Sequence, residues 1–226
     1  MASGLAHELG QPLTVIANYA NGCIRRLHSE NLSRDELKDM LERISAQARR
    51  GGSIIRGLES LVRKGEAKRV PIDINESILE IVDLTEVDAK RHKATTHLEL
   101  KPNLPSVLAD PTQVQQVILN LVQNACEACE QVPVSQRVVT VHTAWAGEDE
   151  LEITVSDSGP GVASELSDRL FEPFFTTKTK GMGMGLAISR SIVEAHHGKL
   201  WSTSNPESGA SFHFTLPIAK EDKSHE

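Results

Sequence analysis

Long apolar runs are missing from this sequence of 226 residues. No stretch approaches the roughly 18 to 20 consecutive apolar residues that a membrane-spanning helix needs. A charged and then apolar leader with a cleavage site is missing too, so we expect neither membrane insertion nor export and place the chain in a reducing cytoplasm. With 39% hydrophobic and 24% charged residues, the composition indicates an ordinary globular protein of one or two domains.

Cysteine is scarce, with only three residues in the chain. An odd number of cysteines cannot pair completely within one chain, which agrees with a reducing compartment. Cys126 and Cys129 form a CxxC sequence, but no second pair of metal ligands accompanies it. We therefore interpret them as neighbours on a helix, with a metal or redox site as the alternative.

Positive charge is in deficit over most of the chain. Up to Glu66 there are 10 Lys and Arg against 8 Asp and Glu, and the remainder has 14 against 23, a net charge of −9. A nucleic acid is a poor partner for this larger part, because a phosphate backbone needs a basic surface. If the acidic part binds a polyphosphate, it needs a metal ion to do so.

The first 66 residues have the periodicity of two helices. From Leu5 to about His28, apolar residues recur at steps of four and three, which predicts a helix with one apolar stripe. Ser33 and Glu36 then form a capping-box pattern that predicts the start of a second helix. A heptad pattern continues from Leu37 to Val62.

Two helices joined by the short HSENLS loop predict an antiparallel hairpin over residues 1–66. Such a hairpin cannot bury both apolar stripes by itself. A homodimeric four-helix bundle would bury them, and packing against the rest of the same chain is the alternative. Pro12 interrupts the first helix, so we expect a bend there, because proline lacks the N–H that would bond to the carbonyl of Glu8. Gly10 should weaken the same region further.

The segment 63–71 is basic and polar and ends in proline, which is typical of a linker. A second domain is expected over residues 67–219, and residues 220–226 are expected to be a disordered tail. The alternation of apolar residues predicts strands at 70–74, 95–100, 106–109, 138–145, 151–156, 199–203 and 211–216. Helices are predicted at 76–92, 111–130 and 184–196. Helices on one face of a mixed sheet give an α+β sandwich.

Three short motifs in this domain suggest a phosphate-bearing ligand, although GxxxxGK[ST], the P-loop pattern, is missing. GMGMGL at residues 181–186 opens a helix with alternating glycines, so backbone N–H groups can approach an anion there. DSGPGV at residues 157–162 follows a strand, but Asp and Gly also make ordinary turns. Asn120 and Asn124 share one face of a helix and are oxygen donors suited to metals, unless they are simply a solvated polar stripe.

In this order, NxxxN, DxGxG, FEPFF and GxGxG resemble the N box, first glycine box, F box and second glycine box of the GHKL ATP-binding fold. That fold is shared by histidine kinases, DNA gyrase B and MutL. The resemblance covers residues from about 70 to 217. It implies Mg²⁺ at Asn124, with Asn120 as its neighbour near the phosphates. It also implies that Asp157 accepts a hydrogen bond from the adenine amino group of ATP.

The same resemblance assigns the glycines. Gly159 and Gly161 would let the chain pass the adenine base, whereas Gly181, Gly183 and Gly185 would hold the triphosphate. The segment from Val162 to Lys180 would be a mobile lid, whose hinge is anchored by Phe171, Phe174 and Phe175. Lys178 is the lid cation expected to contact a phosphate, with a solvated loop lysine as the alternative.

LAHELGQPL, residues 5–13, resembles the H box of sensor histidine kinases of the HExxQPL subgroup. The whole chain is therefore similar to a transmitter module, with His7 as the phosphoacceptor on an exposed face of the bundle. Attack on the γ-phosphorus requires a neutral nitrogen, and Glu8 would orient the imidazole ring and act as the general base. The phosphoryl group would then pass to an aspartate of a response regulator receiver domain.

Gln11 and Glu127 depart from the pattern of this family. Gln11 stands where many relatives carry Thr or Asn to orient the water that hydrolyses the phosphorylated regulator, which puts phosphatase activity in doubt. Glu127 places an acid on the N-box helix where many relatives carry a base, so the phosphate contacts should be distributed differently. Elsewhere, His196 ends a predicted helix together with His197, and we expect both to complement the helix dipole as cations, with metal binding as the alternative.

Two other functions compete with a histidine kinase. One is a plain ATPase or a serine kinase of the same fold, but neither would need the HELGQP motif. The other is a dimeric docking scaffold, which would not need the intact asparagine and glycine motifs. The chain starts inside the first predicted helix. We therefore expect a fragment of a longer protein, without its upstream sensor region or any membrane tether that region carries.

Overall fold

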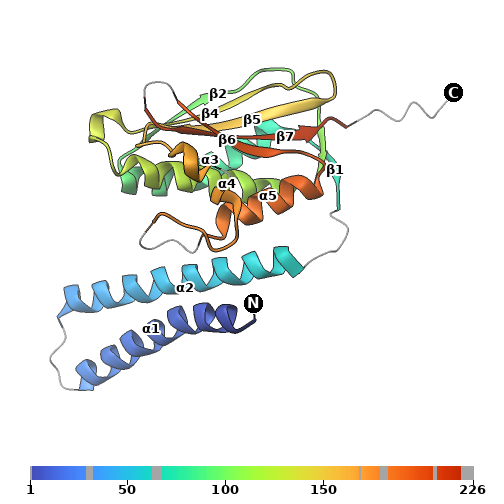
Figure 1. Ribbon diagram of the computed structural model, residues 1–226. Helices are drawn as coiled ribbons and strands as arrows, with labels where there is room; N and C mark the ends of the chain where they lie inside the picture. The colour runs from blue at the N-terminus through green and yellow to red at the C-terminus, as the bar shows by residue number, and fades with distance from the viewer. Residues whose placement is uncertain are drawn as a thin grey trace. The chain divides into compact units, whose positions relative to one another are not determined.

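The structure is a computed structural model, and it describes residues 2–28, 33–62, 68–167, 169–178, 183–205 and 208–219 (Figure 1). The chain divides into two compact units, Met1–Lys64 and Gly65–Glu226. The tail predicted at residues 220–226 lies outside the described residues. Among the helices that the structure describes, none combines the length and the apolar character that crossing a bilayer requires.

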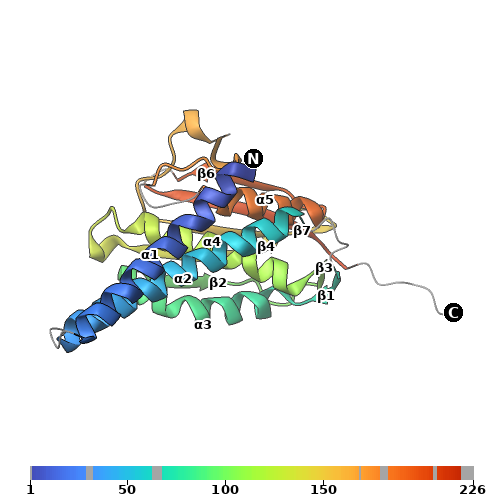
Figure 2. The same ribbon diagram turned by 90° about the horizontal axis from the view of Figure 1, so that it is seen from below.

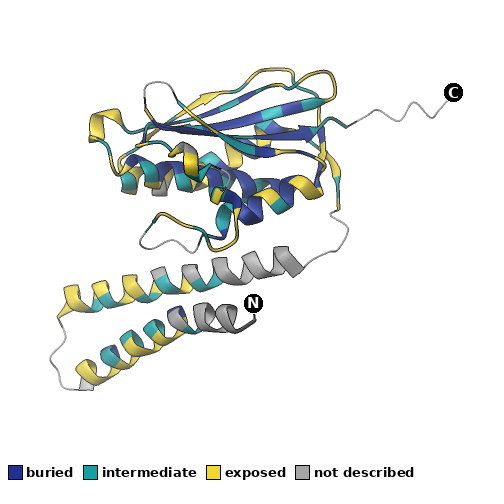
Figure 3. Ribbon diagram, viewed as in Figure 1, coloured by how far each residue is buried: buried dark blue, intermediate teal, exposed yellow. Residues whose placement is uncertain are grey.

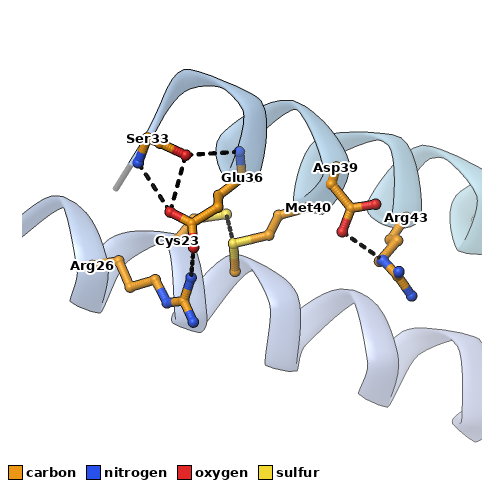
Figure 4. A network of polar contacts seen from close by, with 7 residues as sticks. All are labelled: Cys23, Arg26, Ser33, Glu36, Asp39, Met40 and Arg43. Carbon is orange, nitrogen blue, oxygen red and sulfur yellow. Dashed lines mark hydrogen bonds and ion pairs between the residues drawn. The ribbon is translucent and has the colours of Figure 1, made fainter. Parts of the chain in front are cut away.

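The first unit consists of two long helices, α1 (Ala2–His28) and α2 (Arg34–Val62) (Figure 1). The predicted capping box is present at the start of α2 (Figure 4). The backbone N–H of Glu36 donates to Ser33 Oγ at 3.2 Å, and that of Ser33 donates to Glu36 Oε2 at 3.1 Å. Arg26 Nη1 of α1 reaches Glu36 Oε1 at 3.1 Å. The two helix ends are therefore joined by one carboxylate, which also satisfies a backbone N–H that a helix start leaves without a partner.

Small and sulfur-containing residues bring α1 and α2 close together. Cys23 is buried, and its Sγ lies 3.7 Å from Met40 Sδ (Figure 4). A Cβ on Gly22 would come within 2.9 Å of Met40 Cε, so the helices approach here at a distance that only glycine permits without a shift of Met40. The predicted antiparallel hairpin is thus built on tight contacts of one seam.

Pro12 lies inside α1, which continues as a helix through it. The proline side chain is buried, and the position of a Cβ on Gly51 of α2 would be 3.9 Å from Pro12 Cγ. Two residues further on, Thr14 Oγ1 donates to the Gly10 carbonyl at 2.8 Å. A side-chain hydroxyl that bonds to the carbonyl four residues earlier favours bending of a helix, and so does proline. Thr14 and Pro12 therefore both favour a bend in this part of α1.

The second unit contains a five-stranded sheet in the order β2 (Thr95–Glu99), β4 (Val138–Trp145), β5 (Glu150–Asp157), β7 (Ala210–Pro217) and β6 (Leu200–Ser204). The first pair, β2 and β4, is parallel, and the other pairs are antiparallel. The sheet is therefore mixed, as predicted. A separate antiparallel pair is formed by β1 (Val70–Ile72) and β3 (Val107–Ala109).

Three helices, α3 (Ile74–His92), α4 (Pro111–Cys129) and α5 (Gly185–Ala195), lie on one face of this sheet (Figure 1). They run side by side with α4 between the other two (Figure 2). This arrangement confirms the α+β sandwich with a mixed sheet. Its consequence for function is that α4 contacts both α5 and the sheet, so residues along α4 can face either of them.

Local sequence explains where the helices begin. Asp73 Oδ1 accepts from the backbone N–H of Asn75 at 2.8 Å, so α3 begins two residues before the predicted Glu76. Asp110 Oδ1 accepts from the backbone N–H of Gln113 at 3.2 Å, and Pro111 follows in the first turn of α4, where its missing N–H costs little. The Asp110 cap thereby sets the start of the helix that carries both asparagines.

The core lies between the sheet and the helices (Figure 3). Strand β5 buries Leu151, Ile153 and Val155 on this side, which is the alternation expected of a strand with one covered face. Helix α4 contributes the largest helical share, burying Val114, Val117, Ile118, Leu121, Val122, Ala125, Cys126 and Cys129. Both thiols of the CxxC sequence belong to this buried face, and neither is part of a disulfide.

The sequence did not predict three short 3₁₀ helices, η1 (Val134–Gln136), η2 (Ser164–Leu166) and η3 (Arg169–Phe171). Each spans three residues, which is too short for a periodic apolar pattern to reveal. Two of them lie in the segment between β5 and α5 that was expected to form a lid.

The prediction that His196 acts as a cation at the end of α5 is wrong. Its side chain is fully buried, and burial lowers the pKa of the imidazole below its ordinary value. The backbone N–H of Asp110 donates to Nε2 at 2.9 Å, so Nδ1 carries the proton and faces the Ile192 carbonyl at 2.8 Å. A neutral His196 therefore joins the end of α5 to the start of α4. His197 is exposed, with φ of 62°.

Candidate functional site

Asp157, the last residue of β5, is buried with 6% of its surface exposed. Its Oδ1 accepts from the backbone N–H of Gly159 at 2.8 Å and from that of Ala210 at 3.4 Å. Burial raises the pKa of the Asp157 carboxyl, while these two N–H groups and the charge of Lys178 act in the opposite direction. Both bonds go to Oδ1, so the carboxylate is fixed in orientation by the backbone. Such a group can accept a hydrogen bond from a ligand donor.

The glycines after Asp157 are needed for close approach. A Cβ on Gly159 would lie 2.8 Å from Asp157 Oδ1 and 2.9 Å from the Ala128 carbonyl oxygen of α4. Gly161 has φ of 81°, in the left-handed region that favours glycine. Any side chain at Gly159 would push the loop away from the carboxylate, so this loop depends on both residues for its path past Asp157.

Asn120 lies between α4 and the first turn of α5. Its Nδ2 donates to Ser189 Oγ at 2.9 Å, and Ser189 is almost fully buried. A Cβ on Gly185 would come within 2.3 Å of Asn120 Oδ1. Gly185 is thus needed to make room for Asn120, whereas the sequence suggested room for a triphosphate. Ser189 was missed, although it follows Gly185 by four residues and so lies on the same helix face.

Asn124 and Lys178, which the sequence assigned to a metal and to a phosphate, are in direct contact. Lys178 Nζ donates to Asn124 Oδ1 at 3.0 Å and to Glu127 Oε2 at 2.6 Å. Two oxygens on successive turns of α4 therefore converge on one positive charge. Mg²⁺ prefers oxygen ligands and needs only one or two of them from a protein. The oxygens of Asn124 and Glu127, which already bind the ammonium group of Lys178, therefore fit Mg²⁺.

The segment between β5 and α5 is held at its base. Phe171 is buried, and the Arg190 guanidinium lies 5.6 Å from its ring centroid, so Phe171 is an anchor as predicted. Phe174 has an exposed ring and φ of 69°, and its backbone N–H donates to the Gly183 carbonyl at 3.0 Å. Phe174 therefore closes the base of the segment through its backbone and not through its ring. A non-glycine residue in the left-handed region often marks a functional segment.

Phe175 anchors this segment differently, since the Arg169 guanidinium stacks on its ring with 4.4 Å to the centroid. Gly183 has φ of 64°, and a Cβ there would lie 2.3 Å from the Phe175 carbonyl oxygen. Gly183 therefore lies so close to the backbone of Phe174 and Phe175 that it leaves no room for a side chain. Gly181, also assigned to the triphosphate, lies outside the described residues.

The predicted phosphoacceptor region belongs to α1. His7, Glu8 and Gln11 are all within this helix, as the sequence predicts. Their side chains lie outside the described part of the structure. The exposure of His7 and the orientation of its ring by Glu8 therefore stay predictions.

Comparison with known proteins identifies the class. Residues 1–67 match the His Kinase A (phospho-acceptor) domain, and residues 109–220 match the family described as histidine kinase-, DNA gyrase B- and HSP90-like ATPase. The catalytic domain of the histidine kinase ThkA is 35% identical to this chain, with a TM-score of 0.59. It covers 66% of this chain, which in turn covers 95% of that domain. The chain belongs to the histidine kinase family.

Curated relatives extend the similarity over the whole chain. The sensor protein FixL of Bradyrhizobium diazoefficiens is 43% identical over 223 residues, which cover 98% of this chain and 44% of FixL. The C4-dicarboxylate transport sensor protein DctS of Rhodobacter capsulatus is 38% identical over 221 residues, which cover 98% of this chain and 34% of DctS. The chain thus spans less than half the length of these relatives.

Among solved structures, ThkA in complex with the response regulator protein TrrA has a TM-score of 0.74 and 28% identity, covering 99% of this chain and 62% of that one. The full-length ShkA structure in complex with AMPPNP has a TM-score of 0.72 and 24% identity, covering 96% of this chain and 46% of that one. The likeness to ShkA shows the fold alone. Both comparisons include the hairpin together with the α+β unit.

Proposed function

We propose that this chain binds ATP with Mg²⁺, phosphorylates itself on His7 and passes the phosphoryl group to an aspartate of a response regulator. One observation carries the proposal. The GHKL resemblance assigned three residues to one nucleotide, and all three belong to the same unit, namely Asp157, Asn124 and Lys178. Two of them, Asn124 and Lys178, are in direct contact. The family match at residues 1–67 supplies a phosphoacceptor domain that contains His7.

The fixed carboxylate of Asp157 would bind the adenine amino group, because an ionised carboxylate accepts hydrogen bonds and the amino group donates them. Asn124 Oδ1 would hold Mg²⁺, with Glu127 Oε2 next to it. The metal ion, when bound, withdraws negative charge from the phosphate oxygens. Lys178 would contribute its own positive charge to the same phosphates.

His7 would attack the γ-phosphorus through a neutral ring nitrogen, forming an N–P bond while the bond from the γ-phosphorus to the ADP oxygen breaks. Glu8 would hold the imidazole proton on the other nitrogen and stabilise the positive charge that develops on the ring. Gln11 would orient the water that hydrolyses the phosphorylated regulator, with the longer reach of a glutamine side chain. Transfer to a regulator is supported by ThkA, whose solved structure contains the response regulator protein TrrA.

A homodimer would complete the first unit. In the described part of α1 and α2, several large apolar side chains are exposed, namely Leu13, Ile24, Leu27 and Leu41. A second copy of the hairpin would bury them in a four-helix bundle. We expect the reaction to take place in the cytoplasm, where the three cysteines, none of which is in a disulfide, stay reduced.

Incubation with γ-labelled ATP and Mg²⁺ tests the proposal directly. We expect label on the parent chain that is stable in alkali and lost in acid, as a phosphohistidine is. His7→Gln should abolish the label while leaving nucleotide binding intact, whereas Asn124→Ala should abolish labelling through the metal site. Acid-stable label would instead indicate a phosphoserine. A parent chain that binds ATP without becoming labelled, even as a dimer, would reduce the module to a binding scaffold.

A further inference from the structure

Lys178 makes contacts that no assigned role accounts for. Its Nζ is 3.0 Å from Asn124 Oδ1 and 2.6 Å from Glu127 Oε2, and its side chain is 35% exposed against 49% for Glu127. Its backbone N–H donates to Thr176 Oγ1 at 3.1 Å, which gives the residue a second attachment within its own segment. A solvated lysine on a loop would need none of these partners. The contacts of Lys178 Nζ with Asn124 and Glu127 join the segment after η3 to α4, the N-box helix.

The ammonium group uses the atom that the metal would need. Asn124 Oδ1 is the amide oxygen proposed as the Mg²⁺ ligand, and an ammonium bonded to it stands where that cation would bind. Two cations cannot both occupy this oxygen at bonding distance, because they repel each other. Lys178 therefore has to give up Asn124 Oδ1 when a divalent cation binds there.

Glu127 explains why the ammonium remains nearby after that exchange. Its carboxylate lies three residues after Asn124 on the same face of α4, and its 2.6 Å contact with Nζ is the shorter of the two. A charge-assisted bond of this kind is stronger than the bond to a neutral amide oxygen. Loss of the amide contact thus leaves Lys178 tethered beside the metal ligand.

We propose that Lys178 is an internal counter-cation of the metal site, that it exchanges with Mg²⁺ on Asn124 Oδ1, and that Glu127 is the positioning residue that holds it there. This inference rests on the proposed nucleotide site and deepens it. Its consequence is that magnesium dependence of nucleotide binding is set partly by the protein. Without Mg²⁺ the lysine serves as the cation of the site, and with Mg²⁺ it is displaced from one of its two partners.

Calorimetric titration of the full chain with ADP, in excess Mg²⁺ and in EDTA, measures this exchange. The useful quantity is the ratio of the dissociation constant in EDTA to that in Mg²⁺. Lys178→Met removes the competing cation, so we expect the ratio to rise about threefold or more, mainly through weaker binding in EDTA. Lys178→Arg keeps a cation and should stay within about twofold of the parent ratio. Lys101→Met, which removes an exposed lysine elsewhere in the same unit, is the control for net charge.

The role of Glu127 is tested by repeating Lys178→Met in a Glu127→Gln background. If Glu127 acts by holding Lys178, the effect of Lys178→Met on the ratio should fall to about half or less there. An equal effect in both backgrounds would remove Glu127 from the proposal. A ratio unchanged by Lys178→Met would overturn the exchange while leaving the nucleotide site intact. A parent chain that binds no ADP in either buffer would overturn the nucleotide site and this inference together.

Discussion

Asn120 donates from its side-chain amide to the hydroxyl of Ser189 at 2.9 Å, and this bond joins α4 to α5. Ser189 is almost fully buried, so its hydroxyl cannot turn to water if Asn120 is removed, whereas Asn120 is only partly buried. The bond lies one turn into α5, close to Gly185, with which that helix begins. Asn120 thus positions the start of α5, in addition to any contact with phosphates that the sequence suggests.

Replacing Ser189 by alanine should therefore destabilise the second unit. The partly buried Asn120 amide would lose this partner, which should cost about 0.5 to 1.5 kcal/mol in the free energy of unfolding measured by urea denaturation. Nucleotide affinity should fall as well, because the start of α5 is no longer fixed. Ser135→Ala, at an exposed position in η1, should change stability by less than about 0.5 kcal/mol. Equal effects of the two substitutions would show that the Asn120 contact contributes nothing.

Gly185→Ala should disrupt the same junction by steric overlap. The added methyl group would lie 2.3 Å from Asn120 Oδ1, so either the helix start or the Asn120 side chain has to move. We expect nucleotide binding in calorimetry to weaken about tenfold or more. Shortening the opposing side chain in the double variant Gly185→Ala with Asn120→Ala should recover part of the binding that Gly185→Ala loses. If Gly185 served only to admit phosphate, the double variant would bind no better than the single one.

The sequence predicted the elements of the second unit well because each has a local signal. Strand β4 follows from the alternation between Val138 and Trp145, and α4 follows from Asp110, Pro111 and the apolar spacing behind them. The contacts across the fold have no such local signal. Nothing near Lys178 in the sequence indicates Glu127 as its partner, since 51 residues separate the two.

The candidate site shows the same division. The resemblance placed Asp157, Asn124 and Lys178 in one site, and the structure brings the last two together. It assigned Gly185 to phosphate, whereas the structure gives that glycine a steric reason in Asn120. The charge state of His196 was wrong because burial, which a helix-end position does not reveal, decides it. Contacts between distant residues and the burial of single side chains thus could not be predicted from the sequence.

Asp157→Asn should change which base the site accepts. The asparagine can keep an oxygen facing the N–H groups of Gly159 and Ala210, so the fold is retained, but it presents an amide donor where the second carboxylate oxygen stood. ATP affinity should fall by about 10- to 100-fold. A nucleotide with a carbonyl at position 6 of the purine, such as ITP, should gain relative to ATP.

Calorimetry with ATP and ITP on both proteins measures this preference, and circular dichroism checks the fold. Asp83→Asn, at an exposed position of α3, removes the same charge elsewhere in the unit and should leave the preference unchanged. If Asp157→Asn weakened ATP and ITP equally, the carboxylate would not contact the 6-position of the base.

His196 should make the second unit sensitive to acid. Burial lowers the pKa of its imidazole from the ordinary 6.5, so between the folded and unfolded pKa values the unfolded chain binds more protons. The stabilisation is therefore present above about pH 6.5 and is lost as the pH falls below that value. Urea denaturation at about pH 7.5 and about pH 5.5 should show the lower free energy of unfolding at the acid value.

Several groups around His196 bear on this behaviour. The charges of Arg69 and His197 favour the neutral ring, whereas Asp110 and the Ile192 carbonyl favour the protonated one. His196→Gln should be less stable at neutral pH, because the Asp110 N–H loses a well-placed acceptor, yet its stability should depend less on pH. His197→Gln removes the exposed neighbour, whose charge is the smallest of these influences, and should keep most of the pH dependence of the parent. If His196→Gln retained that dependence in full, the acid sensitivity would have to come from another group.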